Sequence, residues 1–319
     1  MTTWVRVFQV TTLTLVLLVM PLVAQEMVSF VRQWGEMGNG FGEFNALEGI
    51  DVNDDDMVLI ADTENHRVQL FNTDGIFINR WGSMGSEPGQ FMSPEGVTFG
   101  PDDLIYVLDS GNDRVQVFDL EGAFIRVWGE SGEAEGQLSL PIGIAIGPDN
   151  NVYISDTLNQ RIQVFDLVGA FIRSWGGERG TEPGQFQFPV GLDVDSQGDV
   201  YVADNGNGRI QKFTSEGQFI LEWGSNCEVE TGEGCTTPNG ESQFSGPFDV
   251  DVTDDMMYVV DQGNNRIQAF DLGGLFQFTW GSSGDGEGQL AFPKGIAIQT
   301  GGLIFVADSD NHRVQAFER

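Results

Sequence analysis

Short runs of alternating apolar and polar residues recur along the chain from about residue 28 onward, and glycine, asparagine and aspartate separate them. The stretch GIAIGPDNNVYISDTLNQRIQVFDLVGAFIRSWG, residues 143–176, contains four such runs, at 143–147, 151–155, 161–165 and 170–175. A period of two residues predicts half-buried strands, and the turn residues between the runs predict tight connections. We therefore expect a four-stranded antiparallel sheet whose strands, in chain order, are a, b, c and d.

A polar pattern, Asp-x-x-Asn-x-Arg, stands between strands b and c of each copy and occurs six times. Its aspartates and arginines are Asp62 and Arg67, Asp109 and Arg114, Asp156 and Arg161, Asp204 and Arg209, Asp261 and Arg266, and Asp308 and Arg313. Successive arginines lie 47, 47, 48, 57 and 47 residues apart. Because each sheet can bury both faces only against its neighbours, this period predicts a β-propeller. Residues repeated in every blade are expected to hold the b–c connection together, since a catalytic centre would occur only once.

The two ends of the chain indicate how the ring closes. Five copies carry a Trp-Gly pair 14 residues after the arginine, whereas the sixth copy ends six residues after Arg313. The segment SFVRQWG, which contains Trp34, has the pattern of a fourth strand and no repeat before it. We predict that strand 28–35 completes blade six and removes the exposed sheet edges. The expected fold is all-β, a single domain over residues 25–319 with six four-stranded antiparallel blades.

Repeats of the form GIxV…VYVADxxNxRIQxF resemble the NHL repeat, and the tripeptides at 65–67 and 311–313 match its Asn-His motif. The resemblance covers residues 28–319. It implies a six-bladed propeller, a scaffold used for protein binding, for RNA binding in tripartite-motif proteins, and for catalysis in amidating-lyase and gluconolactonase-like propellers. His66 and His312 are the only histidines, and no cysteine or third histidine is placed to complete a zinc set with them. The resemblance therefore does not extend to an amidating lyase.

The net charge and the N-terminal segment indicate the kind of partner and the cellular compartment. The formal net charge is −33, which disfavours nucleic acid and anionic lipid and favours a cationic or polar partner, either a protein or a small ligand. Residues 1–24 have the layout of a secretory signal peptide cleaved near Ala24, the alternative being an uncleaved anchor. We expect a secreted protein, periplasmic or extracellular, that is monomeric. In that setting Cys227 and Cys235 are expected to form a disulfide in the long loop 224–247.

Antiparallel order puts the b–c turns and the long d–a loops on one face of the ring. The positions just before strand a should surround the channel mouth on that face, and they are Glu48, Glu95, Ile142, Val190, Phe248 and Lys294. Three charged residues in contiguous blades face three apolar ones. Such a mouth suits a ligand with a polar or cationic end and an apolar end. The asymmetry is equally compatible with no ligand.

Strand a also carries Asp51, Asp193 and Asp251, which could hold calcium or another divalent cation in the channel, or bind only water and backbone. Two functions stay open. The first is an interaction module that binds through the long-loop face and has no catalytic residues or cofactor. The second, implied by the gluconolactonase-like resemblance, is a divalent-metal-dependent lactonase or lyase, because Glu48-Gly49 matches that family's Glu-Gly pair. Val190 and Phe248 stand where its other ligands, Asn and Asp, are expected.

Overall fold

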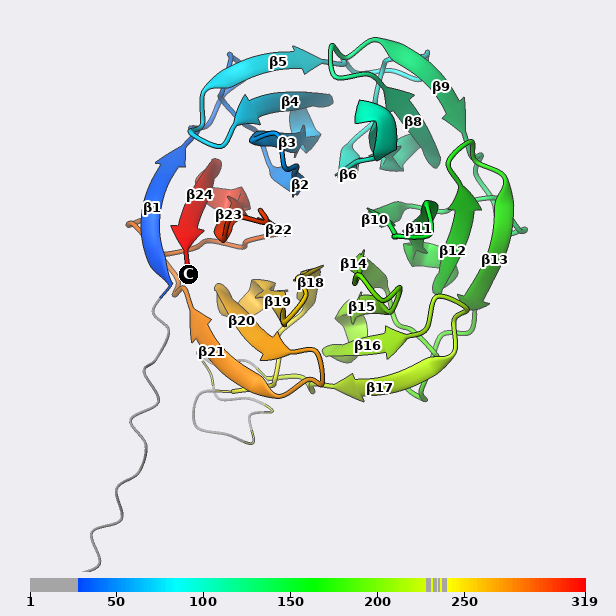
Figure 1. Cartoon of the computed structure of the whole chain (residues 1–319), viewed down its shortest axis with the longest axis vertical. Coiled ribbons are helices and arrows are strands. Elements are labelled where there is room, and N and C mark those ends of the chain that lie inside the picture. Colours follow the sequence, from blue (N-terminus) through cyan, green and yellow to red (C-terminus); the bar gives the residue numbers. More distant parts are fainter. Residues whose placement is uncertain (1–27, 228–230, 232–233, 235, 237–239) are drawn as a thin grey trace, which may run out of the picture.

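The computed structural model describes residues 28–227, 231, 234, 236 and 240–319. Six four-stranded antiparallel sheets stand around a central axis (Figure 1). In five of them the strands run in chain order from the axis outward, and in the sixth the outermost strand is the N-terminal one. The predicted six-bladed propeller is therefore confirmed. The expected signal segment, residues 1–24, lies outside the described residues, and so does Cys235, so the disulfide with Cys227 stays a prediction.

Blades one to three follow one another along the chain. Blade one comprises β2 (Leu47–Val52), β3 (Met57–Asp62), β4 (Arg67–Asn72) and β5 (Phe77–Trp81). Blade two comprises β6 (Pro94–Phe99), β7 (Ile105–Asp109), β8 (Arg114–Phe118) and β9 (Phe124–Trp128). Blade three comprises β10 (Pro141–Ile146), β11 (Asn151–Asp156), β12 (Arg161–Asp166) and β13 (Phe171–Gly176), close to the strands that the hydrophobic pattern predicts.

Blades four to six complete the ring. Blade four comprises β14 (Pro189–Val194), β15 (Val200–Asp204), β16 (Arg209–Phe213) and β17 (Phe219–Trp223). Blade five comprises β18 (Pro247–Val252), β19 (Met256–Asp261), β20 (Arg266–Asp271) and β21 (Phe276–Trp280). Blade six comprises β22 (Gly295–Ile298), β23 (Leu303–Asp308), β24 (Arg313–Glu318) and the N-terminal β1 (Ser29–Trp34). β1 pairs antiparallel with β24, with Trp34 opposite Val314, which confirms the predicted closure.

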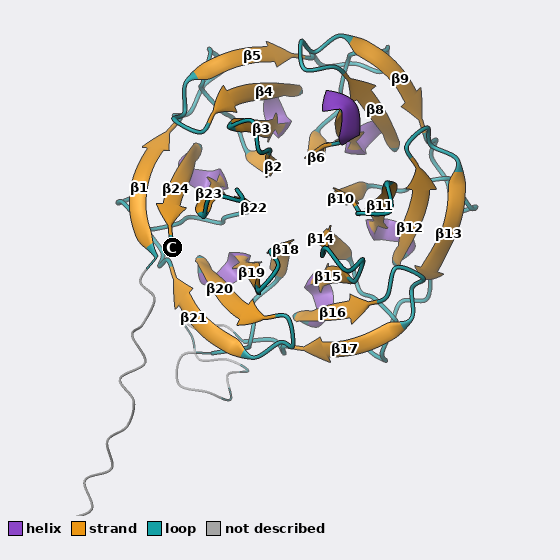
Figure 2. Ribbon diagram, viewed as in Figure 1, coloured by secondary structure: helices purple, strands orange, loops and turns teal. Residues whose placement is uncertain are grey.

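Every b–c connection is one turn of 3-10 helix followed by a residue in the left-handed conformation (Figure 2). These turns are η1 (Thr63–Asn65), η3 (Ser110–Asn112), η4 (Thr157–Asn159), η5 (Asn205–Asn207), η6 (Gln262–Asn264) and η7 (Ser309–Asn311), while η2 (Pro101–Asp103) lies in an a–b turn. Over the described residues, no helix is long and apolar enough to cross a bilayer.

Neighbouring blades pack through aromatic and aliphatic side chains. Tyr106 of blade two, for example, is fully buried in a cluster that includes Ile144 and Val152 of blade three. The c–d turn contributes a glycine that lies flat on the tryptophan of the preceding blade. A Cβ on Gly75 would stand 2.7 Å from the Trp34 ring, and its φ of +79° is one that other residues rarely adopt. This explains why glycine recurs in each c–d turn.

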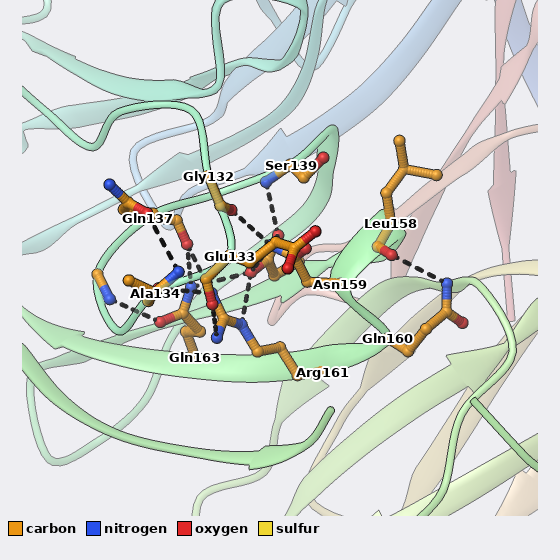
Figure 3. Close-up of polar contacts among 12 residues, drawn as sticks. Gly132, Glu133, Ala134, Gln137, Ser139, Leu158, Asn159, Gln160, Arg161 and Gln163 are labelled. Carbon is orange, nitrogen blue, oxygen red and sulfur yellow. Dashed lines mark hydrogen bonds and ion pairs between the residues drawn. The ribbon is translucent and has the colours of Figure 1, made fainter. Parts of the chain in front are cut away.

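A buried carboxylate organises each b–c connection, and Figure 3 shows polar contacts around the connection in blade three, with Asn159, Arg161 and Gln163 labelled. Asp156 is fully buried, and its Oδ1 accepts hydrogen bonds from the Ser139 backbone N–H at 2.7 Å and from Asn159 at 3.0 Å. Its Oδ2 accepts from Arg161 Nε at 2.7 Å and from Gln163 Nε2 at 3.0 Å. Hydrogen bonds from an arginine and two amides offset the cost of burying the charge.

The same cationic and amide groups bind the long d–a loop. Arg161 donates from Nη1 to the Glu133 carbonyl and from Nη2 to the Ala134 and Gln137 carbonyls, each at 2.8 Å. Gln163 donates to the Gln137 carbonyl at 2.6 Å. We call this set, the aspartate with its asparagine, arginine and glutamine, the loop clamp. Its glutamine follows each arginine by two residues, at 69, 116, 163, 211, 268 and 315, and is part of the repeat, but sequence analysis assigned it no role.

Breaking one loop clamp should destabilise the ring. In Asp156→Asn the new amide NH₂ would face donors from Arg161 and Gln163, and the buried guanidinium would lose its counter-ion. We expect a loss of about 3 kcal/mol in the free energy of unfolding, measured by urea denaturation. The control Glu135→Gln removes a charge from an exposed position of the same loop and should leave stability unchanged. Equal stability of Asp156→Asn and wild type would contradict a stabilising role for the clamp.

Candidate binding site at the ring axis

A cavity of about 260 Å³ lies on the axis, between the innermost strands of the blades. Five of the six predicted mouth residues line it, namely Glu48, Glu95, Ile142, Phe248 and Lys294. Val190 is outside this lining, which corrects the prediction for blade four. Its side chain is 4% exposed and packs with Tyr201 and Val250 in the seam between blades four and five. Apolar contact in the seam is more favourable for valine than exposure to the cavity.

The charged side of the mouth is an ion pair beside a second carboxylate. The Lys294 ammonium bonds the Glu48 carboxylate and stands over the Phe248 ring, 5.4 Å from its centroid. Burial raises the pKa of Glu48, and Lys294 opposes this shift. Burial, together with the charge of Glu48, raises the pKa of Glu95 to about 8. The mouth therefore carries more carboxylates than it has cations to balance them.

The deeper carboxylates connect the inner strands of adjacent blades. Asp51 of blade one accepts from the Phe99 backbone N–H of blade two at 2.7 Å. Asp193 of blade four accepts from Val252 N–H of blade five at 2.8 Å, and Asp251 of blade five accepts from Ile298 N–H of blade six at 2.9 Å. These bonds satisfy backbone donors that the closed ring would otherwise bury unpaired.

Asp249 is a fourth axial carboxylate, and sequence reasoning missed it. The other blades have glycine at this position, because the next inner strand passes very close; a Cβ on Gly143 would stand 2.3 Å from the Val190 carbonyl oxygen. Asp249 accepts instead from the N–H groups of Ile296 at 3.0 Å and Val250 at 2.9 Å. Alignment of the six repeats would have revealed it as the one position without glycine.

No three His, Cys, Asp or Glu side chains converge to hold a metal ion within the part of the chain that the structure describes. At least one carboxylate oxygen of each of the three predicted cation ligands, Asp51, Asp193 and Asp251, already accepts a hydrogen bond from a backbone N–H. A cation in the channel therefore stays a proposal, and the geometry of these carboxylates does not support it. His66 is also occupied: its Nδ1 accepts from the Ser93 backbone N–H of the next blade at 3.0 Å. That contact joins blades one and two.

Exposed apolar side chains stand on the long-loop face over blades one and two. Met37 is 71% exposed, Phe41 69% and Met84 64%; we call these three the loop patch. The Phe41 ring packs at a tilt against Phe77, with the ring centroids 4.9 Å apart, and the Arg80 guanidinium lies over the Phe41 ring, 4.4 Å from its centroid. At the position of Met37 and Met84, the other four loops carry Ser131, Arg179, Asn226 and Ser283. The patch is therefore specific to two of the six blades.

Comparison with known proteins agrees with this architecture. The NHL repeat matches residues 138–165, 186–213 and 290–317, and the family described as a 6-bladed beta-propeller matches residues 52–129. These matches and the ring of six four-stranded sheets define a six-bladed propeller built from NHL repeats. Three of its six repeats thus match the NHL repeat, and the chain has the fold of a six-bladed propeller.

Two curated relatives match over short segments. The Protein brain tumor of Drosophila melanogaster is 34% identical over 82 residues, which is 25% of this chain and 8% of that protein. The E3 ubiquitin-protein ligase TRIM71 of Mus musculus is 47% identical over 45 residues, 14% of this chain and 5% of that protein. The alignments thus span under a tenth of either relative.

Solved structures show the same fold at low identity. A streptogramin B lyase structure superposes with a TM-score of 0.62 at 14% identity and covers 92% of this chain and 99% of that one. The virginiamycin B lyase of Staphylococcus aureus gives 0.57 at 16% identity, over 85% of this chain and 79% of that one. A chain of a nidogen/laminin complex gives 0.61 at 19% identity, over 86% and 89%.

The axial carboxylates should make stability depend on pH. Burial raises the folded-state pKa of Asp51 to about 6, of Asp193 to about 7 and of Asp249 to about 8, all above the unfolded value of 3.8. At pH values between the unfolded-state pKa and the folded-state pKa, each of these carboxyl groups is protonated in the folded state and ionised in the unfolded state. The free energy of unfolding should therefore fall as pH rises from about 5 to about 8.

Asp249→Asn mimics the protonated carboxyl and should make this decline shallower in urea unfolding measured across that pH range. The matched control Glu287→Gln removes a charge from an exposed loop position and should keep the wild-type slope. An unchanged slope in Asp249→Asn would contradict the titration of this carboxyl in the folded protein.

Proposed function

We propose that this propeller is an interaction module that binds a cationic partner through its long-loop face. The observation that carries the proposal is the loop patch, Met37, Phe41 and Met84. Three large apolar side chains are each more than 60% exposed there, in the loops that lead into blades one and two. Large exposed apolar patches mark interaction sites on protein surfaces. Methionine and aromatic residues are well suited to the centre of such a surface.

The loop clamps support this use of the loops. In blade one Arg67 donates to the carbonyls of Asn39, Gly40 and Glu43, at 2.7 to 2.8 Å, so the backbone on both sides of Phe41 is held by the blade. A loop that is held in place before binding loses less conformational entropy when a partner docks. The clamp therefore presents the patch at a small entropic cost.

The negative net charge of the chain favours a cationic partner. The chain has 48 acidic and 15 basic residues, and such a surface accelerates association with positive partners and repels nucleic acid. The same fold occurs in a chain of a nidogen/laminin complex, so it is compatible with docking between proteins. Secretion through the expected signal segment belongs to this proposal.

The alternative, a divalent-metal-dependent lactonase or lyase, has less support from the site. Its proposed metal ligand Glu48 is already bonded to the Lys294 ammonium. The two similar lyase structures share less than 20% identity with this chain and inform only its fold. A binding role uses the exposed loops and requires no catalytic group.

Peptide selection tests the proposed face. A displayed library of random peptides is selected against the wild-type protein, and the affinities of the selected peptides are measured by calorimetry. We expect peptides that combine lysine or arginine with apolar residues. The double variant Met37→Ser/Phe41→Ser should bind them at least about tenfold more weakly, because it removes the apolar centre of the surface.

The control for this test is Ile76→Ser/Leu275→Ser, which removes two similarly exposed apolar side chains from c–d turns on the opposite face. It should bind the peptides as wild type does. Peptides that bind the loop-patch variant unchanged, or that lose affinity for the control variant, would refute a binding role for the long-loop face.

A further inference from the structure

The mouth of the axial cavity holds two carboxylates for one ammonium. Lys294 pairs with Glu48 and rests over the ring of Phe248. Glu95, on the inner strand β6 of the next blade, lines the same cavity. Within the part of the chain that the structure describes, its carboxylate makes no hydrogen bond or ion pair. Glu95 is therefore a partly buried acid that lines the cavity and has no cation bonded to it.

The electrostatic surroundings of Glu95 favour a cation. Desolvation and the neighbouring charge of Glu48 raise its pKa to about 8, although Lys294 opposes the shift. Deeper in the cavity Asp51, Asp193 and Asp251 add further acidic groups. A cation placed against Glu95 would replace its proton and relieve the repulsion from Glu48.

The opposite wall of the mouth is apolar. Ile142 and Phe248 line it, and Ile144 lies below them on the inner strand β10. The cavity volume of about 260 Å³ is several times the ~30 Å³ that one water molecule occupies in the liquid. An alkyl chain of a few methylenes fits this space and would bury apolar area against the wall. A bare metal ion would neither fill this space nor contact the apolar wall favourably.

We propose that the mouth binds a primary alkylammonium group, with the ammonium against Glu95 and the alkyl chain against Ile142 and Phe248. Lys294 already shows this chemistry within the protein, since its own ammonium is held between a carboxylate and an aromatic ring. The ligand group is a lysine side chain of the partner, an assignment that rests on the proposed function. A free alkylamine would use the same chemistry.

Calorimetry with small probes tests the site. The probes are Nα-acetyl-lysine-N-methylamide, n-butylammonium chloride, the uncharged analogue Nα-acetyl-norleucine-N-methylamide, and calcium chloride. Both ammonium probes should bind the wild-type protein, and the uncharged analogue should not. Because protonation of Glu95 competes with the ammonium, affinity should fall as pH is lowered from about 9 to about 6.

Substitutions locate the binding. Glu95→Gln should weaken both ammonium probes by more than about tenfold. It should also make the pH dependence shallower without removing it, because Asp51, Asp193 and Asp249 still titrate in the cavity. Lys294→Met removes the internal ammonium and frees Glu48, so it should strengthen binding. The control Glu87→Gln removes one charge from an exposed loop position of the same face and should bind as wild type does.

Several results would overturn the inference. These are equal affinity of Glu95→Gln and wild type, equal affinity of the norleucine and lysine probes, or calcium binding that Glu95→Gln abolishes while the ammonium probes do not bind. Tighter binding of butylammonium than of the lysine probe would retain the ammonium site but assign it to a free amine.

The outcome is separable from that of the proposed function. If the selected peptides need Met37 and Phe41 but bind Glu95→Gln with full affinity, the interaction face stands and the ammonium site is wrong. If the lysine probe needs Glu95 while peptide binding ignores the loop patch, the ammonium site stands and the proposed face is wrong.

Discussion

The buried aspartate of the loop clamp is the interaction on which the rest of this propeller depends. In blade three Asp156 receives hydrogen bonds from the d–a loop, the b–c turn and strand c at once. A buried carboxylate is costly unless such donors surround it, so its presence forces three separate segments into one geometry. Each loop on the functional face is thereby tied to the strands of its own blade, and its shape depends on the fold.

Near the axis, the blades contact one another through backbone atoms and carboxylates. There the inner strands approach so closely that most blades have glycine, as at Gly143, and the remaining backbone donors are met by carboxylates such as Asp51 and Asp193. These acids thus join the blades and also set the electrostatic potential of the cavity. Because the two roles belong to the same side chains, the acidity of the cavity follows from how the ring is assembled.

Sequence periodicity was sufficient for the strands, the blade number and the closure by Trp34, because these depend on spacing along the chain. It was insufficient wherever the outcome depends on a neighbouring blade. Val190 turns into a seam that only the packed ring creates, and Asp51 was assigned to a possible metal site because its backbone partner Phe99 lies 48 residues away. Asp249 and the clamp glutamine Gln163 can be seen in the aligned repeats, but their roles depend on hydrogen-bond partners that only the folded structure shows.

Function in a repeated scaffold must come from departures from the repeat, and here the departures converge on one part of the ring. The pair of Lys294 and Glu48 joins blade six to blade one, the seam that β1 closes. Met37 and Phe41 lie in the loop between β1 and β2, beside the same seam. A ligand that changes the partner of Lys294 would therefore alter a contact across the closure of the ring. Binding at the mouth and the stability of that closure are linked by the same ion pair, so each must influence the other by an equal free energy.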